Sequence, residues 1–294
     1  MIPDQELIQL NKEGFIPGPL ENEKNYLKRV EFSKKLVADP KKFLVTQNKK
    51  APFSLDEKVL KPRWNWTRSQ LMSLFGISQV DLPMYYSNEN LTFLQPAATW
   101  ILSFDNINLP ILQFRKVLNK KSYLGIYTLD EILAHEAVHA ARVAFDEPHT
   151  EEIFSYMTAS SSFRRVFGPI IRSTKEIITF FSLLFFTLFI QMIWILSSDI
   201  IFFYLSSILG LSTISYVTMG LIRLFNIRRK MKKTLKKLIS ILGNDKKKAK
   251  AVIFRLTDEE IFKFSKMQKE DIANYIQINS KTSLRLKTIL ISYF

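Results

Sequence analysis

Two long uncharged stretches of apolar residues constrain this chain more than any other feature of its sequence. Residues 177–196 contain no charged side chain, and neither do residues 200–222. Twenty residues of helix span about 30 Å, the thickness of the hydrocarbon core of a bilayer. Backbone groups inside a bilayer must pair within their own segment, so such stretches form helices there. Because only residues 197–199 separate the stretches, the sequence predicts a transmembrane helical hairpin over residues 176–222.

The basic residues around the hairpin predict its orientation. Four Lys or Arg lie between residues 164 and 175 and eight between residues 223 and 237, whereas the connection 197–199 has none. Segments on the cytoplasmic side of a span carry the excess of Lys and Arg. We therefore expect an integral membrane protein with two spans and both termini in the cytoplasm, and we expect the membrane to be a bacterial inner membrane.

The basic residues after the hairpin account for much of the formal net charge of +15 (42 Lys and Arg against 27 Asp and Glu). Basic side chains next to a span attract anionic lipid headgroups, each by about 1 kcal/mol near the surface. No recognisable nucleic-acid-binding motif accompanies them, so we expect no nucleic-acid partner. The residues expected to bind lipid are Arg228, Arg229, Lys230, Lys232, Lys233, Lys236 and Lys237.

The rest of the sequence predicts an α+β fold that is mostly helical. Ala98–Phe104 and Leu109–Phe114 read as two strands joined at Asp105–Asn108, that is, as a small strand hairpin. The chain has no cysteine, which excludes a disulfide scaffold, a cysteine nucleophile and thiolate metal sites. The expected segments are a basic helical segment (1–50), a catalytic domain (51–172), the hairpin (176–222), and a basic juxtamembrane helix with C-terminal helices (223–294).

A short sequence in the expected catalytic domain carries the chemistry. Thr128 and Glu131 have the spacing of a capping box, which predicts a helix from this point to about Phe145. That helix contains H-E-x-x-H, with His135 and His139 one turn apart on one face. Two imidazoles placed in this way can bind one Zn²⁺. Glu136 would reach a water bound to the ion and take its proton.

A hydrolytic zinc site needs a third protein ligand, for which Glu151, Glu152 and His149 are the candidates. Here the sequence resembles the gluzincins, zinc metallopeptidases in which a Glu on a following helix completes H-E-x-x-H. More narrowly it resembles the membrane-anchored M48-type peptidases, whose third ligand lies in a pattern like E-x-x-A-D-x-x-A. On that pattern Glu152 is the ligand, Tyr156 stands at the acidic position and Ala159 at the final alanine. Glu151 remains the alternative.

The resemblance implies a zincin-like catalytic domain, Zn²⁺ as cofactor and a polypeptide substrate that pairs with an edge strand upstream of the metal helix. His149, Tyr156 and Arg142 are the nearby donors for the oxyanion that forms during hydrolysis. The sequence thus predicts a membrane-bound zinc metallopeptidase that acts on polypeptides, with membrane-associated ones favoured by its location. The alternative is a non-enzymatic membrane adaptor, whose basic arm binds anionic lipid or an acidic partner and whose H-E-x-x-H is coincidental.

Overall fold

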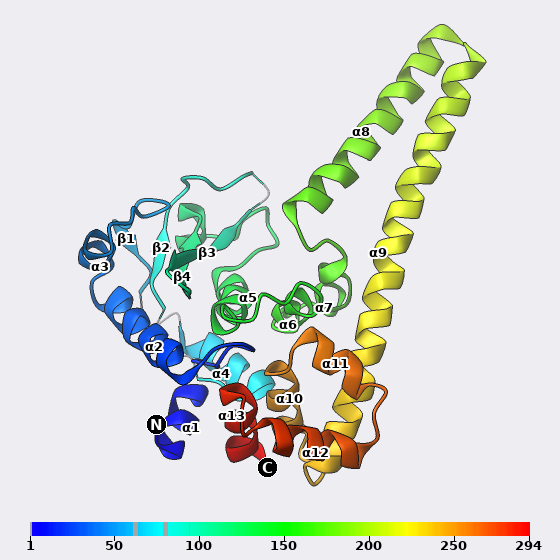
Figure 1. Cartoon of the computed structure of the whole chain (residues 1–294). Coiled ribbons are helices and arrows are strands. Elements are labelled where there is room, and N and C mark those ends of the chain that lie inside the picture. Colours follow the sequence, from blue (N-terminus) through cyan, green and yellow to red (C-terminus); the bar gives the residue numbers. More distant parts are fainter. Residues whose placement is uncertain (1, 61–63, 79–81, 94) are drawn as a thin grey trace.

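The structure is a computed structural model that describes residues 2–60, 64–78, 82–93 and 95–294. These residues form thirteen α-helices and a four-stranded mixed sheet (Figure 1), which confirms the predicted mostly helical α+β class. The helices are α1 (Asp4–Lys12), α2 (Glu23–Ala38), α3 (Pro40–Thr46), α4 (Trp64–Phe75), α5 (Leu129–Ala141), α6 (Glu151–Tyr156), α7 (Ser162–Phe167), α8 (Thr174–Ser197), α9 (Ile200–Ile241), α10 (Lys246–Phe254), α11 (Asp258–Phe264), α12 (Lys269–Asn279) and α13 (Leu284–Tyr293). The strands are β1 (Glu57–Lys58), β2 (Met84–Tyr86), β3 (Ala97–Phe104) and β4 (Ile107–Phe114).

The sheet has the strand order β1-β2-β4-β3, so β3 forms one of its edges. Strands β3 and β4 are antiparallel along their whole length, with Trp100 opposite Ile111, and this confirms the predicted strand hairpin. The tight turn between them places Asp105 at a φ of 52°, a left-handed conformation that Asp tolerates better than most residues. Strand β2 pairs with the other side of β4 in parallel. Among the described residues, the sheet therefore has one edge at the short strand β1 and the other at the longer strand β3.

Helix α5 contains H-E-x-x-H and is helical as predicted, although it ends at Ala141 and not near Phe145. The predicted capping box at its start is wrong, because the Thr128 side chain accepts no hydrogen bond from the helix. The buried Glu131 carboxylate instead accepts hydrogen bonds from the backbone N–H of Ser160 (2.7 Å) and from the Arg164 guanidinium. The Arg164 guanidinium supplies an opposite charge that the backbone N–H at the start of the helix lacks, so the distant partners prevail.

Helix α5 is buried against the sheet on one side and against α4 and α6 on the other (Figure 1). Leu133, Ala134, Ala137 and Val138 are completely inaccessible to solvent. Fully burying a Leu or Val side chain stabilises a fold by about 1.5–3 kcal/mol. The helix is therefore fixed in rotation, and its remaining face, which carries both histidines, lies at the surface of the core.

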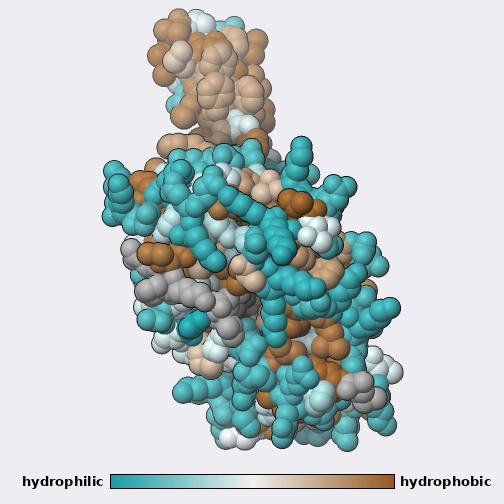
Figure 2. Space-filling view, turned by 90° about the vertical axis from the view of Figure 1, so that its left-hand side faces the viewer, coloured by the Kyte–Doolittle hydropathy of each residue, from teal (hydrophilic) through white to brown (hydrophobic). Residues whose placement is uncertain are grey.

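Helices α8 and α9 form a hairpin that projects from the rest of the molecule, which we call the globular body (Figure 1). Both helices are long and apolar enough to cross a membrane, and no residue in the most apolar stretch of α8 is buried. The space-filling view shows the hairpin as a brown, hydrophobic projection above a largely hydrophilic body (Figure 2). The predicted interruption forms the turn, where Ser198 is left-handed (φ 56°) and the Asp199 carboxylate accepts a hydrogen bond from the Ile201 N–H (3.0 Å). The most apolar stretches of the two helices therefore lie outside the buried core, whereas the second half of α9 contributes to it.

The C-terminal helices pack onto the globular body. Helix α9 continues without a break to Ile241, so the expected boundary at residue 222 lies inside it. The predicted capping box Thr257–Glu260 forms and opens α11. Beyond α9, the buried Arg255 guanidinium donates a hydrogen bond to the Phe75 carbonyl at the end of α4 (2.9 Å). Residues that precede the hairpin in the sequence and residues that follow it thus form one common core.

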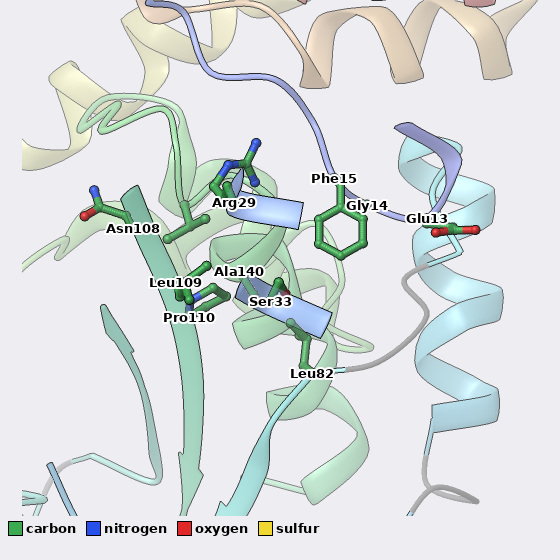
Figure 3. A pocket seen from close by; sticks show the side chains of 11 residues that line it. Glu13, Gly14, Phe15, Arg29, Ser33, Leu82, Asn108, Leu109, Pro110 and Ala140 are labelled. Carbon is green, nitrogen blue, oxygen red and sulfur yellow. The ribbon is translucent and has the colours of Figure 1, made fainter. Parts of the chain in front are cut away.

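A small internal cavity lies between α2, β4 and the end of α5, and it is lined by residues that include Arg29, Leu109 and Ala140 (Figure 3). Its volume of about 20 Å³ has room for about one water molecule. The Arg29 guanidinium beside it is paired with the Glu21 carboxylate at 2.7 Å. This cavity is a packing gap in the core and is too small for an organic ligand.

Candidate metal centre

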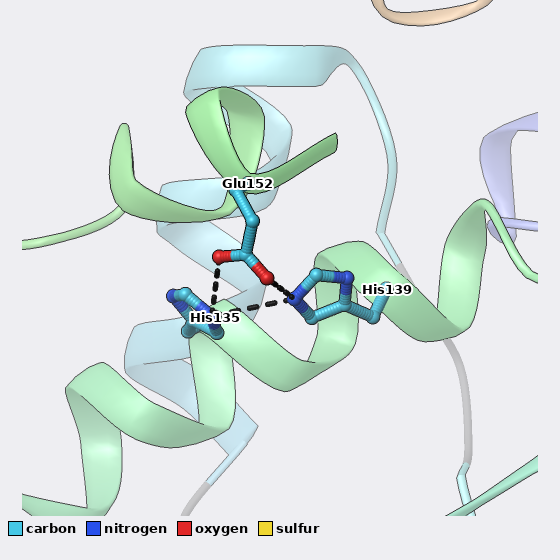
Figure 4. A group of neighbouring side chains, drawn as sticks. All are labelled: His135, His139 and Glu152. Carbon is cyan, nitrogen blue, oxygen red and sulfur yellow. Dashed lines mark hydrogen bonds and ion pairs between the residues drawn. The ribbon is translucent and has the colours of Figure 1, made fainter. Parts of the chain in front are cut away.

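Three side chains from two helices converge at the surface of the core. His135 and His139 project from one face of α5, and Glu152 projects from the first turn of α6. All three side chains are partly buried, with exposed fractions of 21%, 18% and 24%. Figure 4 shows the Glu152 carboxylate facing both imidazole rings, with one oxygen toward each. The structure therefore brings together the residues that the sequence predicts as metal ligands.

The distances among these three groups fit a single metal ion. The His135 and His139 Nε2 atoms are 3.3 Å apart, and the Glu152 oxygens lie 3.6 Å from the first and 3.5 Å from the second. Ligands held tetrahedrally at about 2.0–2.1 Å from a zinc ion lie about 3.3–3.4 Å from one another. The group His135, His139 and Glu152 could thus hold a metal ion.

Glu151, the alternative third ligand, contacts the opposite side of His139. Its Oε1 atom lies 2.8 Å from His139 Nδ1, so the carboxylate accepts a hydrogen bond from that nitrogen and leaves Nε2 facing Glu152. Metal-binding histidines commonly have a carboxylate in this position, which fixes the ring and its tautomer. The two adjacent glutamates therefore take different positions, Glu152 in the group and Glu151 behind His139.

The protonation of the group responds to burial and to the charges within it. Burial lowers the pKa of His135 well below its usual value and raises the pKa of Glu152 to about 7. Burial also acts to lower the pKa of His139, but the hydrogen bond to Glu151 and the nearby carboxylates raise it to about 9. A cation between the ligands would stabilise the ionised carboxylate of Glu152, which has the opposite charge. It would also favour the neutral form of both imidazoles, because a protonated ring would be repelled by the cation.

Glu136 lies beside the group and faces the edge strand. Its Oε2 atom accepts a hydrogen bond of 2.6 Å from the Thr99 hydroxyl on β3. Burial raises the pKa of Glu136, although His139 and the Thr99 hydroxyl act in the opposite direction. Thr99 is a residue that the sequence did not single out. No local signal could have found it, because the contact depends on how β3 packs against α5.

A cleft of about 760 Å³ opens over these residues. Ala97, Ala98 and Thr99 of the edge strand form one wall, and the root of the hairpin contributes Arg172 and Glu176. His135, Glu136, His139, Glu151 and Glu152 also line the cleft. The space is within the range of ligand sites in proteins, about 300–1,000 Å³, and is accessible along a free strand edge.

The three predicted oxyanion donors have different environments. Tyr156 packs its ring edge-on against His135, with centroids 4.8 Å apart, and is adjacent to the group. His149 is exposed and turned toward Arg172, whose Nη1 atom lies 3.3 Å from its Nδ1 atom. The fully buried Arg142 guanidinium donates to the carbonyl of Phe254 and stacks on Phe145 at 4.2 Å. The structure therefore brings only Tyr156 into contact with the metal-binding group.

Asp258, at the start of α11, fixes the segment that leads into α6. Its carboxylate accepts hydrogen bonds from the N–H groups of His149 (2.7 Å) and Thr150 (3.1 Å) and from the Thr150 hydroxyl (2.5 Å). Glu152 follows within the first turn, so Asp258 sets the position of that ligand from the far side of the hairpin. The sequence indicated a helix start at Thr257–Glu260 but gave no sign of this contact.

Gly168 provides a test of how tightly the group is supported. A Cβ atom at this position would lie 2.2 Å from Cδ1 of Tyr156, whose ring rests on His135. We expect Gly168→Ala to reduce the stability of the protein by about 1–3 kcal/mol, because overpacking displaces the ring. Thermal unfolding measures the effect. Gly210→Ala is the matched control, since a Cβ there meets only Thr187 at an ordinary 3.7 Å.

The double variant Gly168→Ala with Tyr156→Ala tests whether the two residues are in contact. Removing the Tyr156 ring vacates the space that the new methyl group at residue 168 needs. The double variant should therefore lose less stability than the sum of the two single changes. Strict additivity would show that Gly168 and Tyr156 are not in contact.

Comparison with models of known protein families, with curated proteins and with solved structures finds no match to this chain. The resemblance to gluzincins therefore rests on residues 128–159 of this sequence. Within that stretch the structure supplies the helix that bears both histidines and the second helix that brings Glu152 to them. Function is accordingly inferred from the geometry of these side chains.

Proposed function

We propose that the chain is a membrane-anchored zinc metallopeptidase whose globular body lies on the cytoplasmic side. The observation that carries the proposal is the triangle formed by His135, His139 and Glu152, with Glu136 beside it in an open cleft. Two imidazoles and one carboxylate are the ligand set of hydrolytic zinc sites, which keep a further coordination position open. A bound zinc ion would supply a Lewis acid and lower the pKa of water in the cleft.

The residues of the chain account for the rest of the reaction. Glu136 accepts the proton of the attacking water and passes it to the leaving amine. The Thr99 hydroxyl, 2.6 Å from the Glu136 carboxylate, holds that carboxylate at the cleft wall. An extended peptide could add to the free edge of β3, where main-chain hydrogen bonds would hold it alongside α5. Such pairing would favour unfolded or extended polypeptides as substrates. The packing of α5 against β3 and β4 supports a zincin-like arrangement of sheet and metal helix.

The two exposed apolar helices support the proposed anchoring, and the basic residues that flank them in the sequence support the proposed orientation. For a helix along the membrane normal, Arg228 lies about 9 Å beyond Ile222 and Lys236 about 21 Å beyond it. Electrostatic attraction to anionic headgroups fades within about 8–10 Å at physiological salt. Lipid binding is thus proposed for the residues nearest the span, while Lys237 already donates hydrogen bonds to the carbonyls of Phe264 and Ser265 (both 3.0 Å).

Metal removal tests the proposal. The purified full-length protein should contain about one zinc ion per chain and should cleave a fluorescently labelled, unfolded casein. Treatment with a chelator should abolish cleavage, and zinc, but not magnesium, should restore it, because imidazole ligands favour the former. Protein that binds no zinc and cleaves nothing would instead support the non-enzymatic membrane adaptor.

A further inference from the structure

Several apolar side chains of the globular body are exposed, and two of them, Ile126 and Phe163, line a cavity together with residues of the hairpin. Phe93 and Phe163 are each 70% exposed, Ile126 is 59% exposed and Leu124 is 48% exposed. We name these four residues the apolar rim. We propose that the apolar rim inserts into the bilayer, so that the globular body rests on the lipid surface beside its two spanning helices.

The segments that carry the apolar rim contact one another through Tyr123, Tyr127 and Arg164. The Phe93 ring meets the Tyr123 ring at 6.5 Å, and Tyr123 forms an isolated β-bridge with Tyr127, the neighbour of Ile126. The Arg164 guanidinium lies 4.9 Å from the centroid of the Tyr127 ring, and Phe163 precedes Arg164 in α7. These contacts thus link three separate segments of the chain, each of which carries an exposed apolar residue of the rim.

A cavity between the apolar rim and the hairpin indicates the level of the rim relative to the bilayer. Ile126 and Phe163 line a cavity of about 760 Å³ together with Phe180 of α8 and Tyr216 of α9. Phe180 lies about 4.5 Å inside the first uncharged stretch, and Tyr216 lies about 9 Å inside the second, measured along the helices. If the hairpin spans the bilayer, rim residues that face these positions lie at the level of the lipid boundary.

The polar groups around the cavity suit a lipid neighbour. The Arg164 guanidinium is paired with the Glu131 carboxylate, and Arg223 is paired with Glu176 at 2.8 Å, so neither cation is left without a counter-charge. Tyrosine is enriched where proteins meet the membrane–water interface, because its ring is apolar and its hydroxyl is polar. Tyr127 and Tyr216 both line the cavity.

The conformation of the turn at residues 123–127 points to the same occupant. Leu124 and Gly125 both have positive φ angles, 52° and 72°. A left-handed leucine is rare, and turns that face water favour Asn, Asp, Ser or Gly at such positions. A leucine and an isoleucine at the tip of a turn beside two spans indicate acyl chains as the neighbour, because apolar contact there removes their surface from water.

Site-directed labelling of the intact protein tests this inference, since the chain has no cysteine of its own. Single variants Ile126→Cys and Phe163→Cys, labelled with an environment-sensitive fluorophore, would be placed in vesicles of equal parts phosphatidylcholine and phosphatidylglycerol. Phe186→Cys in α8 serves as the control inside the bilayer and Val45→Cys in α3, 78% exposed, as the control in water. Lipids that carry a nitroxide quencher on the acyl chain report contact with the bilayer.

We expect both rim labels to be quenched several-fold more strongly than the Val45 label, approaching the quenching at Phe186. Rim labels that behave like Val45 while Phe186 is quenched would overturn the inference. Rim labels shielded from a water-soluble quencher but untouched by the lipid quencher would also overturn it, because a second protein copy would then cover them. The inference rests on the membrane anchoring in the proposed function and not on hydrolysis. An unquenched Phe186 label would overturn both the anchoring and the inference. It would not bear on peptide hydrolysis, which the zinc and casein experiment tests separately.

Discussion

Glu136→Gln is expected to reduce peptide hydrolysis strongly while leaving the zinc content of the protein unchanged. The amide occupies the same space as the carboxylate but cannot accept a proton from water. General-base catalysis contributes about 10²–10⁴-fold to the rate, so kcat should fall by that order. The ligands His135, His139 and Glu152 are untouched, and zinc stoichiometry should remain at wild-type level. Casein cleavage and metal analysis of the same preparation measure the two quantities.

Glu270→Gln is the matched control for this experiment, because it makes the same chemical change at an exposed position in α12. It should leave cleavage and zinc content as in the wild type. Full hydrolytic activity in Glu136→Gln would show that another group takes the proton. Loss of zinc in that variant would show instead that Glu136 contributes to metal binding. Its assignment as a general base would then be wrong.

Glu152→Ala and Glu151→Ala are expected to weaken zinc binding to very different extents. Glu152 completes the triangle, and losing one of three ligands should weaken binding on the order of 10³-fold, given structural zinc sites worth about 10–16 kcal/mol. Glu151 contacts Nδ1 of His139 at 2.8 Å and acts on the metal only through that ring. Loss of such a partner costs about 10–100-fold in metal affinity.

Competition against a chromogenic zinc chelator measures both affinities on the full-length protein. Thermal unfolding of the metal-free variants checks that each one is folded. The reverse order, with Glu151→Ala losing the metal and Glu152→Ala retaining it, would identify Glu151 as the ligand. Equal, small losses in both variants would show that a different group completes the site.

Much of the candidate site could be predicted from local sequence. Residues four apart on a helix share a face, so the positions of His135 and His139 follow once α5 is helical. The strand hairpin β3–β4 follows from two apolar runs around a short polar turn, and the two apolar stretches could only form long helices. The sequence also favoured Glu152 over Glu151, and the distances in the structure agree with that preference.

What the sequence could not predict depends on partners far away in the chain. Glu131 has the spacing of a capping residue, yet it binds Ser160 and Arg164, because the segment after α6 returns to the start of α5. The spacing of Arg142 to His139 alone predicts an oxyanion donor, whereas the Arg142 guanidinium donates a hydrogen bond to the carbonyl of Phe254, 112 residues later in the chain. Local spacing identifies which residues can interact, but tertiary packing decides which partner each one finds.

The contact between Asp258 and the segment before Glu152 has a consequence for the order in which the protein matures. Thr150 and Asp258 are 108 residues apart, and both apolar helices are translated between them. During translation, the helix that bears Glu152 must leave the ribosome long before the residue that fixes its start is made. We therefore expect the nascent chain to remain inactive until the hairpin has been inserted and the last helices have been released.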